Sequence, residues 1–451
     1  MKKRFVLVKT YLLFAALFAI FFQNSRASDQ NEPMELGLEA AVRLARELNP
    51  TLSIAHLEVE RADAGVNVVR GRFLPSLSIS GVYTRNIKTP VIFLPPGSPF
   101  GDVLEIGSDN SYLATFVAGM PVYNPALNAS LRTAVAERAL AGETLRASQI
   151  ELEYFVHSAY YDVLLAKESA RVMQQSLGKA LETLAMVENL KRQGLASEFE
   201  LIRARVQAEN LRPSLLQAEN GYRMAVNYLK ALIGLEADRE IVVKGTLAEF
   251  SETLFAGFSI IHAERGLQNN SELVRLDLQR NLLDFQAENI RATGLPSMAL
   301  TSNYNFQTEA NDFRFGGYRW VNTFSAGLRF SIPLSSGFTI RNQVRQLDLM
   351  GRQLEMQRDY LEQNLNIQLD NLLNSMKVAR EKSATAMATI EMAERGYQIA
   401  QVRYATGQGT LMEVNDSELA LTQARFNLIQ ADHELLKSLA EYRRFIGEKN
   451  I

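Results

Sequence analysis

An internal duplication is the feature of this chain that most restricts its fold. Short motifs recur in the same order and at nearly equal spacing in both halves; RELNPTL at 46–52, for example, is echoed by LQNNSEL at 267–273. The recurring prolines and glycines form the pairs Pro75 and Pro296, Pro121 and Pro333, Gly194 and Gly407, and Gly234 and Gly447. Self-similarity on this scale indicates two copies of one structural unit. We expect a first repeat at 28–234, a connecting segment at 235–265 and a second repeat at 266–451.

Each half predicts a helix, two strands, a very long helix, a tight turn and a further helix. From 128 to 193 there is no proline, and a helix of that length would be roughly 100 Å long. The range 341–406 has the same character. Rods of this length imply helical hairpins that pack along their length. Apolar residues recur with a helical period in the first rod at Val156, Ala159, Tyr160 and Val163, and at Leu177, Leu181, Leu184 and Val187.

The N-terminal segment predicts export. Lys2, Lys3 and Arg4 precede an apolar run at 11–22 and a small-x-small site that ends at Ala27. This pattern is typical of a signal peptide at 1–27, with an uncleaved anchor as the alternative. No later run reaches the roughly eighteen apolar residues of a membrane helix, so any membrane span is expected to be β. The chain has no Cys, which excludes disulfides and a lipid-bearing cysteine, and its net charge of −2 gives no basic footprint for nucleic acid.

The predicted strands have the pattern of a membrane barrel. In 75–84, Leu77, Ile79 and Tyr83 alternate with serines and a threonine, and 320–332 alternates in the same way. Such segments of about ten residues are typical of transmembrane barrel strands, although one strand alone would fit a soluble sheet equally well. Four strands cannot close a barrel, and an open edge is not tolerated in lipid. Two chains would supply eight strands and a filled interior, whereas three would supply twelve and leave room for a channel, so we expect a trimer.

Taken together, these motifs resemble the TolC-like family of bacterial outer membrane efflux proteins. The resemblance rests on Asn49-Pro50, the two LPS strand entries, the strand-ending prolines and the two glycine turns. It implies a mainly α protein with a membrane β-barrel: a homotrimer with a 12-stranded barrel in outer membrane lipid and a long α-helical periplasmic tunnel. It further implies a passive exit duct of a tripartite efflux or type I secretion system, docked on a periplasmic adaptor and an inner-membrane pump. The segment 235–265 would then belong to a collar around the tunnel.

The same resemblance assigns roles to residues at the two turns. It implies that the turns contact the adaptor and that acidic residues, with a tyrosine that helps to hold the closed tip, form the tunnel entrance. This chain departs from the family pattern at one position. In the family a basic residue bonds across the closed tip, and Gly409 stands at that position here. Either another residue fastens this entrance, or it is held less tightly. The implied docking residues are Gly194, Leu195, Ser197, Gly407, Thr410 and Leu411, and the implied entrance residues are Glu200, Tyr404, Glu413 and Asp416.

Two other classes of function were compared with the channel. For an enzyme, the sequence offers no catalytic constellation, no metal-ligand spacing among His56, His157, His262 and His433, and no cofactor motif, so we expect the histidines at solvated helix positions. The second class is an exported coiled-coil interaction protein such as a periplasmic adaptor. An adaptor carries one helical hairpin between halves of a β-module, whereas this chain predicts two hairpins and no such module.

Overall fold

The computed structural model describes residues 33–256 and 266–448, so the expected signal peptide lies outside the described residues. The first half contains β1 (Met34–Leu36), α2 (Leu38–Leu48), α3 (Pro50–Gly71), β2 (Ser76–Arg85), β3 (Val91–Phe93), β4 (Val103–Glu105), β5 (Asn110–Tyr123), α4 (Pro125–Arg192) and α5 (Glu198–Ile233). Next come β6 (Ile241–Val243) and α6 (Leu247–Ala256). The second half contains α7 (Ser271–Ala292), β7 (Ser297–Ala310), η2 (Phe315–Gly317), β8 (Val321–Ser331), α8 (Thr339–Ala405) and α9 (Leu411–Ile446).

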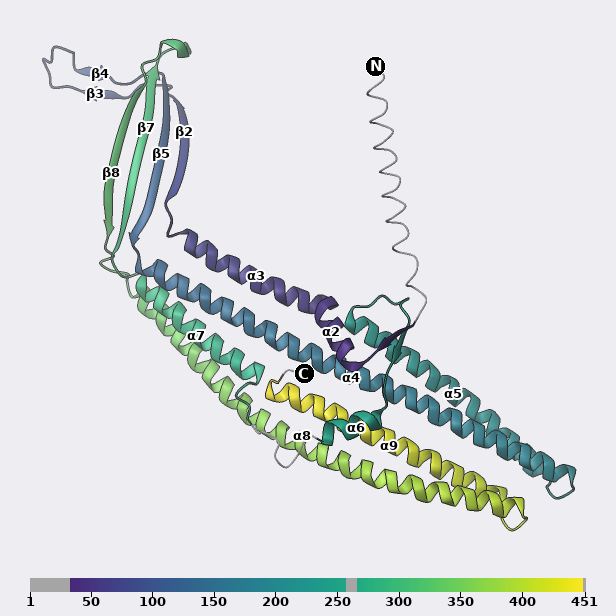
Figure 1. The fold of residues 1–451 in the computed structure, drawn as a ribbon. Coiled ribbons are helices and arrows are strands. Elements are labelled where there is room, and N and C mark those ends of the chain that lie inside the picture. Colours follow the sequence, from purple (N-terminus) through teal and green to yellow (C-terminus); the bar gives the residue numbers. More distant parts are fainter. Residues whose placement is uncertain (1–32, 257–265, 449–451) are drawn as a thin grey trace, which may run out of the picture. The chain divides into compact units, whose positions relative to one another are not determined.

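The predicted order of elements is confirmed in both halves (Figure 1). The long helices α4 and α8 have 68 and 67 residues and begin and end within a few residues of the expected positions. None of the helices in the described ranges combines the length and the apolar character needed to cross a bilayer.

The chain divides into two compact units, and one of them is built on a sheet. This unit comprises His56–Thr144 and Glu272–Leu361. Its antiparallel sheet has the order β2-β5-β7-β8, so strands from both halves pair through β5 and β7, for example at Asn110↔Ala310. Among the described residues the outer strands β2 and β8 each have a neighbour on one side only, and every residue in them is exposed in the single chain.

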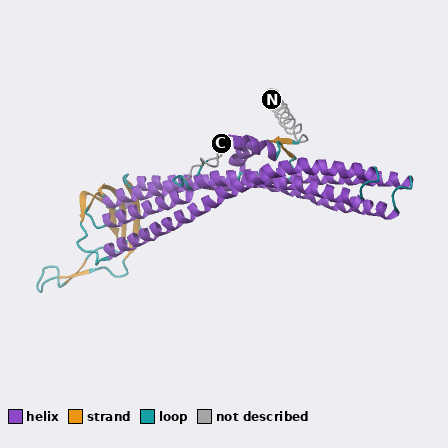
Figure 2. Cartoon of the chain, turned by 90° about the horizontal axis from the view of Figure 1, so that it is seen from below, coloured by secondary structure: helices purple, strands orange, loops and turns teal. Residues whose placement is uncertain are grey.

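The other unit, the described parts of Met1–Ala55, Leu145–Ser271 and Glu362–Ile451, is helical. Its main apolar core contains the predicted face of α4, with Val156, Ala159, Tyr160 and Val163 all at most 1% exposed. The Tyr160 hydroxyl donates to the carbonyls of Leu36 and Lys244, at 3.1 and 2.7 Å. Because β1 and β6 form a parallel pair, these bonds attach that pair to α4. In Figure 2 the two helical hairpins of this unit, α4–α5 and α8–α9, each close in a short loop.

The duplication extends to a tertiary clasp that occurs once in each half. Asn49, which precedes α3, donates from Nδ2 to the Leu232 carbonyl at 2.8 Å, near the end of α5. Asn270, which precedes α7, donates to the Phe445 carbonyl at the same distance, near the end of α9. Just beyond those carbonyls, each helix ends at a glycine with a left-handed backbone, Gly234 at φ +88° and Gly447 at φ +76°. The asparagine and the glycine thus hold the end of one helix against the start of another.

The two clasp glycines should tolerate no side chain. A Cβ at Gly234 would lie 2.8 Å from the Leu48 carbonyl oxygen, and one at Gly447 would overlap the Asn269 carbonyl. Because both positions also have positive φ, we expect Gly234→Ala and Gly447→Ala each to destabilise the fold by about 3 kcal/mol or more. The control is Gly178→Ala inside α4, where nothing lies within 4 Å and a gain of up to about 1 kcal/mol is expected. Thermal unfolding followed by circular dichroism tests this; equal effects of Gly447→Ala and Gly178→Ala would contradict it.

Candidate functional site

The two long helices end in the same way at the predicted turns. Gly194 has φ +77°, its N–H bonds the Lys191 carbonyl at 2.9 Å, and the next N–H bonds the Leu190 carbonyl at 2.8 Å. Gly407 has φ +72° and repeats the pattern with the carbonyls of Tyr404 and Arg403, at 3.1 and 2.8 Å. This is the Schellman cap, which needs a left-handed residue and therefore favours glycine. The local rules of helix termination thus account for both turns.

The helices that follow the turns begin differently. Ser197 caps α5 in a reciprocal capping box: its Oγ accepts from the Glu200 N–H at 3.2 Å, and its own N–H donates to the Glu200 carboxylate at 2.8 Å. Thr410 caps α9 by accepting from the Glu413 N–H at 3.2 Å. The Glu413 carboxylate turns instead toward Arg403, with 3.9 Å between its Oε2 and Nη2 of the guanidinium. The two predicted acidic positions are therefore equivalent in sequence but engaged by different partners.

One apolar cluster joins the two hairpins just behind the turns. It includes Val187 on α4, Ala204 on α5, Tyr404 on α8, and Leu411 and Val414 on α9, all at most 5% exposed. Leu411 and Tyr404 therefore lie inside the tip of the single chain. Among the predicted docking residues, Leu195 is 72% exposed, and Gly194, Ser197, Gly407 and Thr410 are also exposed.

Tyr404 and Glu200 bring α8 and α5 together at the tip. Burial, and after it the nearby Glu200 carboxylate, raise the pKa of Tyr404 to about 12, so the hydroxyl is protonated at neutral pH. The hydroxyl has no partner with hydrogen-bond geometry among the described residues. Glu200 is thus a close electrostatic neighbour whose carboxylate is oriented by the Ser197 capping box.

Comparison with known proteins identifies the family. The model of the outer membrane efflux protein family matches residues 41–235 and 263–448, one segment in each half. The chain belongs to this family. Membership confirms the predicted family and outer membrane location, and it supports an efflux channel rather than an adaptor. The family consists of channel proteins, not enzymes.

Relatives and solved structures agree with this membership. The chain is 22% identical over 413 residues to outer membrane protein TolC of Vibrio cholerae, which covers 89% of each chain. It is 22% identical over 424 residues to the alkaline protease secretion protein AprF of Pseudomonas aeruginosa, covering 93% of this chain and 86% of that one. A crystal structure of CusC matches with a TM-score of 0.74 at 18% identity and covers 91% of this chain and 92% of that chain.

In this efflux family member, the interior near the tips is more polar than the apolar pattern predicted. Of the face predicted at the lower end of α4, Leu181 is 38% exposed, whereas Ser176 and Thr183 are 2% and 4% exposed. The Ser176 Oγ donates to the buried Glu418 of α9 at 2.5 Å, and Ser383 of α8 donates to the buried Asp432 at 2.6 Å. The predicted face is retained at Val187, which is fully buried, and at Leu184, which packs against the same cluster, whereas Leu181 departs from it. A hydrophobicity pattern does not detect the buried pairs between serine and carboxylate side chains.

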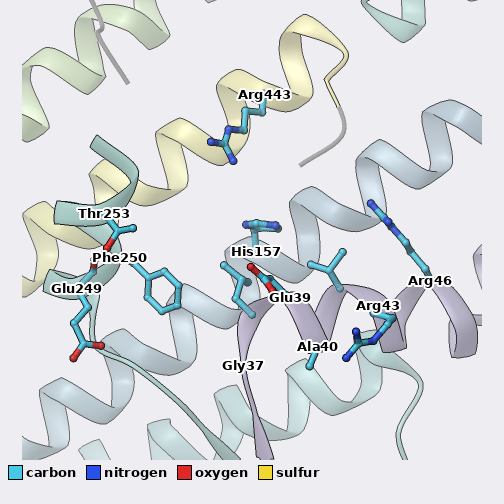
Figure 3. Close-up of a pocket in the computed structure, with 12 residues that line it drawn as sticks. Gly37, Glu39, Ala40, Arg43, Arg46, His157, Glu249, Phe250, Thr253 and Arg443 are labelled. Atoms are coloured by element: carbon cyan, nitrogen blue, oxygen red, sulfur yellow. Dashed lines mark hydrogen bonds between the residues drawn. The ribbon is translucent and has the colours of Figure 1, made fainter. Parts of the chain in front are cut away.

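The histidine prediction also needs correction. His56 is exposed as expected, and His262 lies outside the described residues. His433 is half-buried, with Nε2 2.6 Å from the Asp162 carboxylate. His157 is 7% exposed and lies at a cavity of about 700 Å³ between α2, α4, α6 and α9, together with Arg46 and Arg443 (Figure 3). Burial, followed by the charges of Arg443 and Arg46, lowers the pKa of His157 to about 4.

The depressed pKa of His157 predicts a loss of stability in acid. Its folded value of about 4 lies below the ordinary 6.5, so the unfolded chain binds the extra proton first. Stability from this group is complete above pH 6.5 and is lost as pH falls toward 4, by about 3 kcal/mol in all. His157→Gln should flatten the dependence of unfolding free energy on pH in this window, and His56→Gln, at an exposed position, should not. Parallel pH profiles for wild type and His157→Gln would contradict the assignment.

Proposed function

We propose that three copies of this chain form the outer membrane exit duct of a tripartite efflux or type I secretion system. Cargo would pass through it passively, from a periplasmic adaptor and an inner-membrane pump to the exterior. The observation that carries the proposal is a family match to both halves of a chain whose described sheet leaves the outer edges of β2 and β8 without a partner strand. Repeats 28–234 and 266–451, joined by the collar segment 235–265, would each contribute two strands and one hairpin.

The sheet supports a barrel shared among copies. Large apolar side chains stand on both outer strands, among them Leu77 at 82%, Phe324 at 71% and Phe330 at 68% exposed. In water such a surface and two open edges would favour aggregation, whereas in a bilayer the apolar face would contact lipid tails. The edges then require partners, because unpaired backbone groups are costly in hydrocarbon. Pairing β8 of one copy with β2 of the next would satisfy them, and three copies would close twelve strands.

Aromatic side chains gather at one end of the sheet. Tyr83 stacks on Tyr112 with ring centroids 5.0 Å apart, and Tyr112 also contacts Phe315 and Tyr318 at 5.5 and 6.0 Å. Aromatic girdles of this kind mark the level at which a membrane barrel meets the headgroups. Girdles occur at both faces of such a barrel, but the longer connections lie outside, so the end of the sheet that bears η2 and the β3–β4 hairpin would lie at the outer surface of the membrane.

The helical hairpins also carry uncovered apolar seams. On α5, Phe199, Ile202 and Val206 recur at intervals of three and four residues and are all more than half exposed. On α8, Met392, Ile399 and Val402 are 60% or more exposed. This spacing is typical of helices that pack in coiled coils. We propose that α5 of one copy packs against α8 of the next, which would continue the tunnel around its circumference.

The oligomeric state tests this arrangement. Native mass spectrometry of the detergent-solubilised protein should show three chains. Ile202→Glu and Ile399→Glu each place a charge in the proposed seam and should weaken the trimer. Gln207→Glu adds the same charge to α5 about a third of a turn away from the seam and should leave it intact. A monodisperse monomer or dimer of the wild-type chain would contradict the shared barrel.

The exposed part of each tip is proposed as the adaptor contact. At Gly194 and Gly407 a Cβ would meet nothing within 4 Å, so both glycines face open space in the single chain. With the exposed Leu195, Ser197 and Thr410, they leave room for close approach of a partner helix. Leu411 would act indirectly, by packing the interior of the tip. Glu200, Glu413 and Asp416 would lie at the entrance, with the buried Tyr404 behind them.

Steric blocking of the tips should abolish export without preventing assembly. We expect Gly194→Leu with Gly407→Leu to remove the tolerance to toxic cargo that the chain confers when produced with its cognate adaptor and pump. Gly194→Ala with Gly407→Ala controls for the positive φ, because it imposes similar backbone strain with a small side chain. Gly97→Leu, also at positive φ in open space but in the β3–β4 hairpin, controls for leucine itself. Export that survives both leucine changes would place the adaptor contact elsewhere.

A further inference from the structure

The second turn contains an arginine that the sequence pattern did not single out. Arg403 lies in the last turn of α8, and its side chain crosses the turn to the start of α9. Its Nη2 donates to the Gln408 carbonyl at 3.1 Å and lies 3.9 Å from the Glu413 carboxylate. The guanidinium therefore links the end of one helix to the first turn of the next.

Gly409 provides the space for this arrangement. A Cβ at Gly409 would lie 3.0 Å from the Arg403 Cβ, 3.1 Å from Glu413 Oε2 and 3.2 Å from the Tyr404 nitrogen. Each distance is shorter than an ordinary van der Waals contact, so a side chain at 409 would displace one member of the pair. Because Gly409 has no side chain, Arg403 and Glu413 can approach each other across it.

The backbone restrains both members of the pair. The N–H groups of Gln408 and Gly409 both bond the Arg403 carbonyl, at 2.8 and 3.0 Å, which folds the turn over this residue. Glu413 is fixed at the other side by the Thr410 cap. The first turn lacks the arrangement, because Leu190 and Ala196 stand at the positions of Arg403 and Gly409. The first turn has a different ion pair, in which Lys191 at the end of α4 meets Glu198 at the start of α5. The approach of Arg403 to Glu413 across a glycine is therefore specific to the second turn.

We propose that Arg403 cancels the charge of Glu413, so that Asp416 is the uncompensated carboxylate that the second turn presents at the duct entrance. This inference rests on the proposed function. Asp416 is exposed three residues after Glu413, and no ion pair joins it to any residue in the described ranges. A three-fold entrance would then carry three net negative charges from this turn instead of six. Because Arg403 and Glu413 are about half exposed, the effect of the pair lies in the local field rather than in stability.

Block of the channel by a multivalent cation measures this field. The probe is hexaamminecobalt(III), added at the periplasmic side of a planar bilayer that holds the purified wild-type protein or a variant. Arg403→Gln removes three positive charges from the entrance. At roughly 10 Å, with a Debye length of about 10 Å, this should lower the blocking concentration of a trivalent cation about tenfold. Arg403→Lys keeps the charge and should stay within about twofold of wild type.

Two further variants separate charge from shape. Arg403→Gln with Glu413→Gln restores the net charge, so its blocking concentration should return to the wild-type value. Arg395→Gln removes an exposed arginine of α8 that lies about two turns before Arg403 and pairs with Glu391. This change should leave the blocking concentration unchanged. An unaltered blocking concentration in Arg403→Gln would overturn the inference, as would an Arg403→Lys change as large as that of Arg403→Gln. Wild-type protein that forms no conducting channel would overturn the proposed function itself.

Discussion

A helix of nearly seventy residues is stable in water only while one of its faces remains covered, and the rest of this structure follows from that requirement. Intrinsic propensity contributes little over such a length, so packing must supply most of the stability. In the helical unit, α4 meets this need first with Val156, Tyr160 and Val163 and then, toward the turn, with Ser176, Thr183 and Val187. Apolar contacts alone would permit neighbouring helices to slide by a heptad. The buried pairs Ser176–Glu418 and Ser383–Asp432 stabilise one register, because sliding would strand a carboxylate without its donor.

The parts of the fold that local rules govern could be predicted from the sequence. Helical period, strand alternation and the spacing of glycine and proline gave the order of elements, the ends of α4 and α8, and the two turns. The parts that depend on neighbours distant in the sequence could not. His157 is surrounded by arginines from α2 and α9, Leu411 packs into a cluster of four helices, and Arg403 acts across the space that Gly409 leaves. Each of these depends on what faces the residue, and a single sequence does not contain that information directly.

Comparison of the two halves shows which features of the repeat both copies have kept. Both keep an asparagine that bonds a helix-end carbonyl and a left-handed glycine beside it, and the junction admits no Cβ at that glycine. Both also keep the Schellman cap. The polar contacts around the cap differ: one half has a reciprocal serine and glutamate box beside the Lys191–Glu198 ion pair, and the other has Arg403 bonded to the Gln408 carbonyl and facing Glu413. Shared backbone geometry thus coexists with different charge.

In the proposed trimer, that difference would give the tip end a three-fold rather than a six-fold symmetry. A three-fold ring of chains would place six hairpin ends around one opening, alternating between the two kinds of turn. A partner built from six identical subunits would meet two chemical surfaces, one with an exposed Leu195 and one with the Arg403 guanidinium on the Gln408 carbonyl. Its subunits would have to adopt two binding modes, or engage the two kinds of end with unequal strength. Pseudo-equivalence of this sort would let a single partner species both anchor to the duct and act on its opening.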